Sequence, residues 1–263
     1  VPGLSTGLGD LDLAISGLNK SDLILLAARP GMGKTSFALN VALNVAKAVH
    51  KTVAVFSLEM SREQLATRLL ASEALVENNR LKTGALRETD WEKIAGAATI
   101  LNKVDIRIDD NPMLSVADMN AKCRRLDDLG LVVIDYLQLM QSAKRTESRV
   151  QEISDITRNL KIMAKELHVP VLCLSQLSRA NESRSDKRPM LSDLRESGAI
   201  EQDADVVMFL YRDDYYNKDS DKRNQAECII AKNRRGETTT IPLQWLPEFT
   251  AFSSLERNYE EPD

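Results

Sequence analysis

Short apolar runs alternate with longer amphipathic segments along most of this chain. The runs favour strands because they are short and rich in Val, Ile and Leu, whereas the longer segments carry apolar residues at helical spacing. Strands are predicted at residues 23–27, 52–57, 104–108, 131–134, 169–174 and 206–210. Helices are predicted at 34–49, 61–74, 89 to about 102, 115–129 and 147–167. This alternation predicts an α/β fold, with a mostly parallel, twisted sheet flanked by helices.

Local hydrogen-bonding residues indicate several of the helix ends. Ser61 and Gln64 have the spacing of a capping box, and so do Thr89 and Glu92. Gly130 follows the 115–129 segment and is predicted to end that helix as its C′ residue.

The last part of the chain has a different pattern. Residues 226–232 and 238–245 read as strands joined by the short polar stretch 233–237, which predicts a C-terminal antiparallel β-hairpin added to the sheet. Residues 178–189 and 212–224 lack apolar periodicity and are expected to be loops. A chain of 263 residues is one large domain or two small ones. Without a convincing linker, we expect a single domain over residues 1–263.

The strongest chemical signal follows the first predicted strand. Residues 28–35 read A-R-P-G-M-G-K-T and open a helix. Glycines let backbone N–H groups surround phosphate oxygens, and the helix N-terminus adds a positive field. Lys34 would reach the β- and γ-phosphates, and Thr35 would hold Mg²⁺. The motif usually begins with glycine, so this is a variant P-loop, and its expected nucleotide-binding residues are Arg29, Pro30, Gly31, Met32, Gly33, Lys34, Thr35 and Ser36.

Three polar residues at predicted strand ends are candidates for a hydrolytic site. Asp135 ends an apolar strand and would act on Mg²⁺ as a Walker B residue. Glu59 follows strand 52–57, where a carboxylate could orient and deprotonate the attacking water. Gln176 follows strand 169–174 and could sense the γ-phosphate. Ligands bind at this edge of α/β sheets, but polar residues are also normal there, so the residues alone leave the roles of Glu59 and Gln176 open.

Longer motifs follow one another along the chain and are more specific than a P-loop. They read FSLEM at 56–60, VIDYLQL at 133–139, LSQLSR at 174–179, KRPMLSDLRESG at 187–198, IEQDAD at 200–205, YRDDYY at 211–216 and IAKNR at 230–234. The set closely resembles the C-terminal motor domain of the DnaB family of bacterial replicative DNA helicases, over nearly the whole chain.

The resemblance implies a RecA-like fold and a ring of six copies with ATP and Mg²⁺ at each subunit interface. It makes Glu59 the catalytic carboxylate and Gln176 the residue that couples the γ-phosphate to the DNA-binding loops. Lys232 and Arg234 would act in trans on the ATP of a neighbouring copy. The Lys-x-Arg spacing favours Arg234 over Arg235 as the arginine finger.

The family also holds single-stranded DNA in a central channel, largely through phosphates. Arg195, Glu196 and Gly198 match one of its DNA-contacting loops, and a guanidinium with a backbone N–H suits sequence-independent phosphate contact. Segment 179–195 carries five cations against three acids, whereas the chain as a whole has a net charge of −4. A negative chain does not exclude DNA binding through such a local patch.

The family's N-terminal domain and linker helix are missing from this sequence, so poor assembly of the chain alone is expected. In the full-length protein, primase and a helicase loader are the expected partners. The alternative kept open is a RecA-like recombinase or ring ATPase that does not unwind DNA. A non-enzymatic platform that uses ATP as a clip, and a small-molecule kinase, fit the residues less well.

The composition says more about the cellular compartment of the protein than about its function. Three cysteines far apart in sequence argue against a disulfide framework and for a reducing compartment, so the cytoplasm is expected. Cys173 and Cys228 lie in apolar runs and are expected to be buried. No Cys or His cluster has zinc spacing, and no apolar run approaches the ~20 residues of a membrane span.

Overall fold

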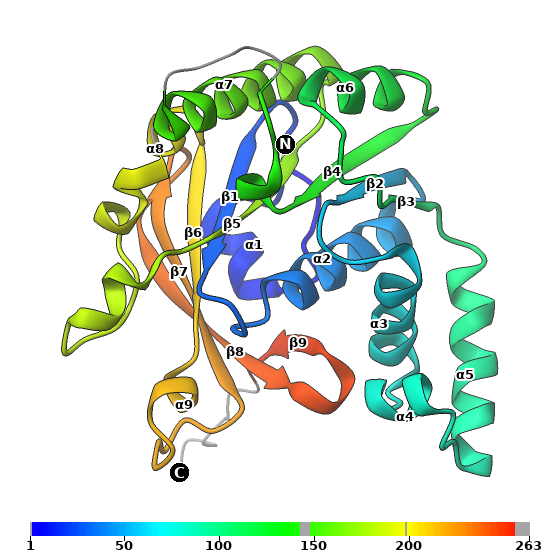
Figure 1. Ribbon diagram of the computed structural model, residues 1–263. Coiled ribbons are helices and arrows are strands. Elements are labelled where there is room, and N and C mark those ends of the chain that lie inside the picture. The colour runs from blue at the N-terminus through cyan, green and yellow to red at the C-terminus, as the bar shows by residue number, and fades with distance from the viewer. Residues whose placement is uncertain (1, 143–147, 198, 256–263) are drawn as a thin grey trace, which may run out of the picture.

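The computed structural model describes residues 2–142, 148–197 and 199–255 (Figure 1). Within them, nine strands form one sheet in the order β3-β2-β4-β5-β1-β6-β7-β8-β9. The strands are β1 (Leu23–Ala28), β2 (Thr52–Ser57), β3 (Ile106–Asp109), β4 (Leu129–Asp135), β5 (Val171–Gln176), β6 (Val206–Tyr211), β7 (Gln225–Asn233), β8 (Thr239–Leu246) and β9 (Ala251–Ser254).

Strand direction divides the sheet into two parts. The six strands from β3 to β6 pair in parallel, and β6 to β9 pair antiparallel. The predicted parallel sheet and the added hairpin, β7 and β8, are therefore confirmed. Strand β9 extends this antiparallel part, and the sequence analysis missed it.

Helices cover both faces of the sheet. They are α1 (Gly9–Ile15), α2 (Lys34–Val49), α3 (Arg62–Ala74), α4 (Asn78–Thr83), α5 (Glu88–Leu101), α6 (Val116–Arg124), α7 (Arg149–Leu167), α8 (Ile200–Asp203) and α9 (Asp213–Tyr216). Alternate residues of β1 face opposite ways. Ile24 and Leu26 pack into the core that contains α2, while Leu23 and Leu25 pack into the core that contains α7. Both layers are visible in Figure 1, with α6 and α7 along the top.

Helices α3, α4 and α5 form a group beside the β3 edge of the sheet (Figure 1). Helix α3 begins as predicted, because Ser61 and Gln64 cap each other reciprocally. The predicted start of α5 at Thr89 and Glu92 is wrong. That helix begins one residue earlier, and the Asp90 carboxylate accepts the backbone N–H of Arg87 at 2.9 Å.

The predicted end of the helix at residues 115–129 is also wrong. Helix α6 stops at Arg124, and Gly130 lies inside β4 instead of following a helix. Gly130 is required there by packing, since a Cβ atom would lie 2.9 Å from the Cβ of Lys51. Helix α7 begins at Arg149, and Glu147, where it was predicted to begin, lies outside the described residues.

The three cysteines are buried and unpaired. Burial raises the pKa of the Cys123 and Cys228 thiols to about 12 and raises the pKa of Cys173 as well. They therefore act as small apolar core residues, as expected for Cys173 and Cys228. Among the helices of the described residues, none is long and apolar enough to cross a membrane.

Candidate nucleotide site at the carboxyl edge of the sheet

The P-loop connects the carboxyl end of β1 to the first turn of α2. Gly31 and Gly33 have φ values of +81° and +97°, which L side chains rarely adopt, so both glycines are needed for the loop path. A Cβ atom on Gly33 would also lie 2.9 Å from the Phe252 ring. Gly33 immediately precedes Lys34, so the loop ends on the free N–H groups of a 16-residue helix.

Ala28 explains the departure from the usual motif. It is the last residue of β1, fully buried, paired with Gln176 of β5 and part of the core on the α2 face. This position is a strand residue whose methyl group packs inward, and the backbone here does not require glycine.

Lys34, Thr35 and Asp135 form a tight cluster below the loop. Lys34 Nζ lies 2.9 Å from Asp135 Oδ1, and the Thr35 hydroxyl donates to Asp135 Oδ2 at 2.7 Å. Lys34 Nζ also lies 3.9 Å from Glu59 Oε2 and 4.4 Å from the centroid of the Tyr136 ring. The P-loop cation and the predicted Walker B carboxylate are thus neighbours, although about 100 residues separate them in sequence.

Glu59 and Gln176 complete this group, as expected for the carboxyl ends of parallel strands. Glu59 follows β2, and its side chain is half exposed, where solvent can reach it. Gln176 ends β5, and its backbone N–H donates to Gln138 Oε1 at 2.9 Å, while Gln138 Nε2 donates to the Ser175 hydroxyl. Gln138 therefore fixes the backbone beside the predicted phosphate sensor.

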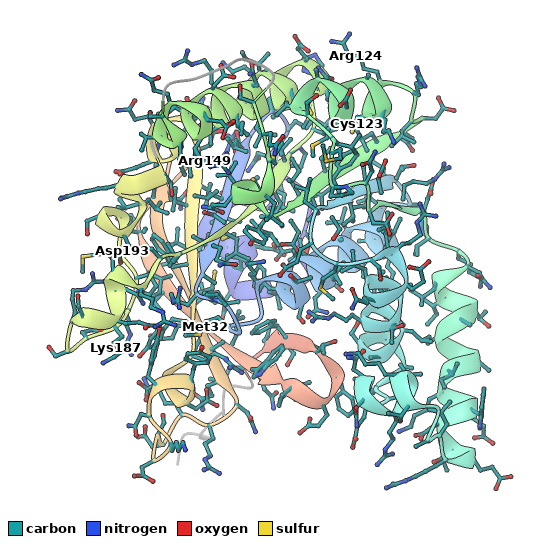
Figure 2. The ribbon with its side chains drawn as sticks, in the orientation of Figure 1. Met32, Cys123, Arg124, Arg149, Lys187 and Asp193 are labelled. Atoms are coloured by element: carbon teal, nitrogen blue, oxygen red, sulfur yellow. The ribbon has the colours of Figure 1, made fainter. Side chains whose placement is uncertain are left out.

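A hollow of about 290 Å³ opens over these groups. Its lining brings together most of the predicted residues: Pro30, Gly31, Gly33, Lys34, Thr35, Ser36, Glu59 and Gln176. Arg29 and Met32 behave differently. The Arg29 guanidinium binds Glu182 and the carbonyl of Leu177, and the Met32 side chain is buried beneath the loop (labelled in Figure 2). Only the backbone of these two residues belongs to the phosphate loop.

The same hollow contains residues that the sequence analysis missed. Arg68 of α3 lines it and donates to the Ser36 hydroxyl at 3.4 Å. Burial lowers the pKa of Arg68, and the negative charges of Asp135 and Glu59 oppose that shift. Because α3 reaches the loop only in the folded chain, no local motif marks Arg68.

The C-terminal strands supply a second missed group. Trp245 of β8 and Thr250 line the hollow, and in the described residues Trp245 Nε1 and Thr250 Oγ1 are buried without a hydrogen-bond partner. The Arg212 guanidinium lies 5.4 Å from the Trp245 ring and donates to the carbonyl of Gly31 at 3.1 Å. An aromatic face, a cation and unpaired polar atoms therefore border the phosphate loop.

The two predicted trans-acting cations lie at the other end of the strands. Lys232 pairs with Val207, and Val206 pairs with Ile24 near the start of β1. At about 3.3 Å per residue, this places Lys232 more than ~10 Å from the P-loop that follows Ala28. Lys232 Nζ contacts the carbonyl of Glu201 at 2.6 Å, and Arg234 Nη1 contacts Asp205 Oδ1 at 2.8 Å, so neither side chain enters the hollow of its own chain.

The predicted DNA loop is only partly described. Arg195 is exposed on a 3-10 turn, the side chain of Glu196 is not described, and Gly198 lies outside the described residues. Part of the positive charge of segment 179–195 is paired with carboxylates. Arg184 forms a two-point ion pair with Asp193, and Arg188 binds Asp186 and Glu227. Two of the five cations counted in the sequence are therefore held by carboxylates, on the side of the molecule where Figure 2 labels Lys187 and Asp193.

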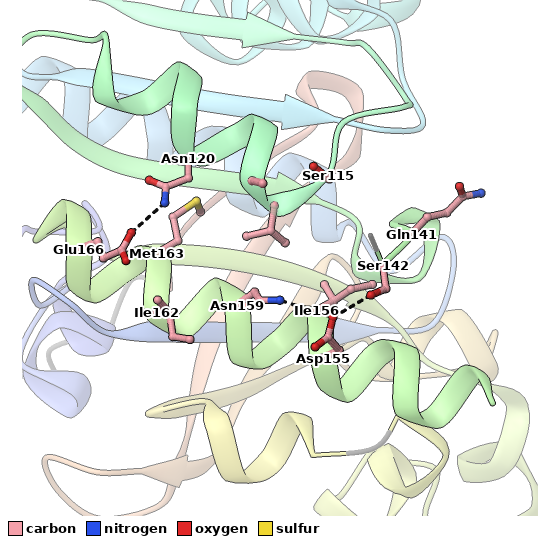
Figure 3. Close-up of a pocket in the computed structure, with 12 residues that line it drawn as sticks. Ser115, Asn120, Gln141, Ser142, Asp155, Ile156, Asn159, Ile162, Met163 and Glu166 are labelled. Carbon is pink, nitrogen blue, oxygen red and sulfur yellow. Dashed lines mark hydrogen bonds between the residues drawn. The ribbon is translucent and has the colours of Figure 1, made fainter. Parts of the chain in front are cut away.

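A second hollow, of about 280 Å³, lies between α6 and α7 (Figure 3). Its wall is mixed: Asn120 donates to Glu166 and the Ser142 hydroxyl donates to Asp155, next to the apolar Ile162 and Met163. Its lining contains two carboxylates and no lysine or arginine, which does not suit a phosphate group. The first hollow is therefore the candidate nucleotide site.

Comparison with known families agrees with this geometry. Residues 3–254 match the family model of the DnaB-like helicase C-terminal domain. A replicative DNA helicase DnaB of Geobacillus stearothermophilus is 53% identical over 99% of this chain. A replicative DNA helicase DnaC of Bacillus subtilis is 50% identical over the same share. The chain spans 58% of the length of each of these two relatives.

Solved structures give the same result for the fold. A solved ATPase domain superposes with a TM-score of 0.93 at 42% identity, covering 97% of this chain and 92% of that one. A DnaB-like replicative helicase, solved in a study of its interactions with primase, has the same TM-score and identity and covers 97% of this chain and 62% of that one. The RadB recombinase, at 17% identity and a TM-score of 0.61 over 96% of this chain and 100% of its own, shares the RecA-like fold alone.

Proposed function

This chain belongs to the family of DnaB-like helicase C-terminal domains, and from that membership we propose that it is the ATP-driven motor of a replicative DNA helicase. In this proposal residues 1–263 act as one motor domain. Copies form a hexameric ring, hydrolyse ATP at their interfaces, travel along single-stranded DNA and unwind duplex DNA.

One observation carries the proposal. Lys34, Thr35, Asp135, Glu59 and Gln176 meet at one edge of the sheet, around a loop that ends on a helix N-terminus. Each is the residue type that phosphoryl transfer to water requires at that place: a cation, a hydroxyl, two carboxylates and an amide.

The residues present fit a magnesium nucleotide. Gly31 and Gly33 give the phosphates a close approach to backbone N–H groups, and Arg68 faces the hollow without a carboxylate within ion-pair distance in the described residues. Thr35 and Asp135 would hold Mg²⁺ in place of their present mutual hydrogen bond. The ion, when bound, neutralises phosphate charge.

The chain's own residues have distinct roles in this mechanism. Lys34 leaves Asp135 to bind the phosphates, and its positive charge stabilises the negative charge that develops on them during transfer. The exposed Glu59 carboxylate orients water and accepts its proton. Gln176, at the end of β5, contacts the terminal phosphate, and Gln138 keeps its backbone in place.

Lys232 and Arg234 complete the site of a neighbouring copy. Their place at the opposite end of the strands supports this role, because a cation there is far from its own P-loop but can face the P-loop of the next copy in a head-to-tail assembly. Such a contact repeats around a closed ring of identical copies.

The DNA contacts and the remaining partners rest on the family alone. Arg195, Glu196 and Gly198 are proposed to bind the phosphates of single-stranded DNA. One relative's structure was solved in a study of its interactions with primase, and we propose primase and a helicase loader as partners of the complete protein. Such a motor would work in the bacterial cytoplasm.

ATP turnover measured at several protein concentrations, with and without single-stranded DNA, tests this function. Turnover per copy should rise steeply with concentration, because each site needs two copies, and DNA should stimulate it. A forked duplex then tests strand separation, and Lys34→Ala is the inactive control. Turnover that is independent of both concentration and DNA would contradict a translocating ring and support a self-contained ATPase.

Nucleotide binding should change the emission of Trp245. The chain has two tryptophans, and Trp91 is exposed on α5, so Trp91→Phe leaves Trp245 as the only reporter. Because Trp245 lines the hollow next to Arg212, titration with MgADP should alter its fluorescence, and Lys34→Ala in the same background should weaken the response. Unchanged emission, with MgADP binding verified by equilibrium dialysis, would remove Trp245 from the site.

A further inference from the structure

The turn between β7 and β8 is fastened to the sheet by two arginine–aspartate pairs. Asp22 directly precedes β1, Asp205 directly precedes β6, and both carboxylates are almost completely buried. Arg235 binds Asp22 through Nε–Oδ2 and Nη2–Oδ1, both at 3.1 Å. Arg234 binds Asp205 through Nη1–Oδ1 at 2.8 Å.

The two arginines are held very differently. The Arg235 guanidinium makes a two-point contact, which fixes its orientation as well as its position. The Arg234 side chain is 61% exposed, and within the described residues only its Nη1 has a partner. Its backbone is nevertheless fixed, because its N–H donates to the carbonyl of Asp205 at 3.0 Å. Arg234 thus has an anchored main chain and a largely free guanidinium.

The two aspartates also differ in the partners that they would keep if their arginine moved away. Asp205 would keep the Lys161 ammonium at 2.6 Å and the backbone N–H of Leu23 at 2.8 Å. Burial is the largest influence on Asp205 and opposes its ionisation, but the hydrogen bonds from Lys161, Arg234 and the Leu23 N–H, together with the charge of Lys161, lower the pKa of this carboxyl. Asp22 has no other cation within ion-pair distance among the described residues. Withdrawing Arg235 would therefore leave a buried carboxylate uncompensated, whereas withdrawing Arg234 would not.

We propose that Asp22, Arg235 and Asp205 are positioning residues that hold the turn so that Arg234 is presented to the nucleotide of a neighbouring copy. Arg235 is an anchor and not a second finger. The inference rests on the proposed function, since it assumes that Arg234 acts in trans. A cation that stabilises a transition state must be placed within a fraction of an ångström. Asn233 also ties the start of the turn to the carbonyl of Ala14 at 2.8 Å, but among the described residues Arg235–Asp22 is the ion pair that holds the turn without engaging Arg234 itself.

Mixing two inactive variants tests the proposal. Arg235→Gln should lower ATP turnover by about 10²-fold, the cost expected of misplacing a catalytic group by about 1 Å. Its affinity for fluorescent ADP should stay unchanged, because its own hollow is intact. Adding Glu59→Gln copies, which lack the water-activating carboxylate but present Arg234 correctly, should restore turnover. Asp22→Asn should behave in the same way.

Two further variants make the outcome decisive. Arg107→Gln breaks the exposed ion pair between Arg107 of β3 and Asp105, at the β3 edge of the sheet and away from the β7–β8 turn, and should keep normal turnover. Arg234→Gln mixed with Glu59→Gln tests the trans role itself. If that mixture stays inactive, the trans role in the proposed function fails, and this inference fails with it. If it recovers, the inference alone is overturned by an Arg235→Gln variant that is fully active, or by one that Glu59→Gln copies cannot rescue.

Discussion

Arg234→Gln is expected to lower ATP turnover by about 10³- to 10⁵-fold, the range for removing an arginine that acts on a transferred phosphate. Arg234 directly follows β7 and lies beside the amino-terminal end of β6, far from its own P-loop, so the loss would arise at the site of the next copy. Nucleotide affinity of the isolated copy should therefore be unaffected. The free energy of unfolding should change little, because Asp205 keeps Lys161 and the Leu23 N–H as partners.

Steady-state turnover at saturating ATP, together with equilibrium binding of fluorescent ADP, measures both effects. A matched control is Arg223→Gln, an exposed arginine that precedes β7 on the same part of the chain. Its turnover should match that of the unaltered protein. Loss of ADP affinity in Arg234→Gln at concentrations where the protein is monomeric would contradict the trans assignment, because it would place Arg234 in its own site.

Glu59→Gln is expected to lower the rate of hydrolysis by about 10²- to 10⁴-fold while ATP still binds. The amide retains the size of the carboxylate but cannot accept the proton of the attacking water. Lys34 Nζ lies only 3.9 Å from Glu59 Oε2, so removing this negative charge also removes an attraction that competes with the phosphates for the lysine. ATP affinity should consequently stay the same or increase.

Single-turnover hydrolysis and ATP binding, measured on the same preparation, separate these two effects. Glu63→Gln is the matched control, since Glu63 is an exposed carboxylate in the first turn of α3, four residues further along the chain. It should hydrolyse ATP normally. Normal turnover in Glu59→Gln would eliminate it as the proton acceptor, and loss of ATP binding would make it part of the binding site instead.

The sequence predicts the parallel part of the fold well because its signals are local. The helix at 34–49 and the strand at 52–57 match the structure residue for residue, since the helix has apolar residues at helical spacing directly after Gly33 and the strand is a short apolar run directly after Lys51. The end of α6 was misplaced because Gly130 resembles a helix C′ residue, but its lack of a side chain serves a contact with Lys51 across the fold. No local pattern distinguishes these two uses of glycine.

The residues of the candidate site likewise include some that a local motif marks and others that no local motif marks. The phosphate loop, Asp135 and the two strand-end residues were found from motifs that are contiguous in sequence. Arg68, Trp245 and Thr250 were missed because they reach the hollow only through the packing of α3 and β8 beside the loop. The ion pair of Arg188 could not be predicted for a related reason, since its partner Glu227 lies on a strand about 40 residues away.

The separation of the P-loop from Lys232 and Arg234 determines how many complete nucleotide sites an assembly of copies can contain. If Lys232 and Arg234 act in trans as proposed, each copy carries one part of a site at one end of its strands and the complementary part of another site at the other end. In an open row of such copies, the nucleotide pocket at one terminus has no donor of cations, and the arginine at the other terminus has no phosphate to act on. Joining the two termini creates one additional working site without adding a subunit. Turnover per subunit is therefore higher in a closed ring than in an open row of the same number of copies. A missing copy leaves the adjacent nucleotide pocket without its trans-acting cations and therefore inactive.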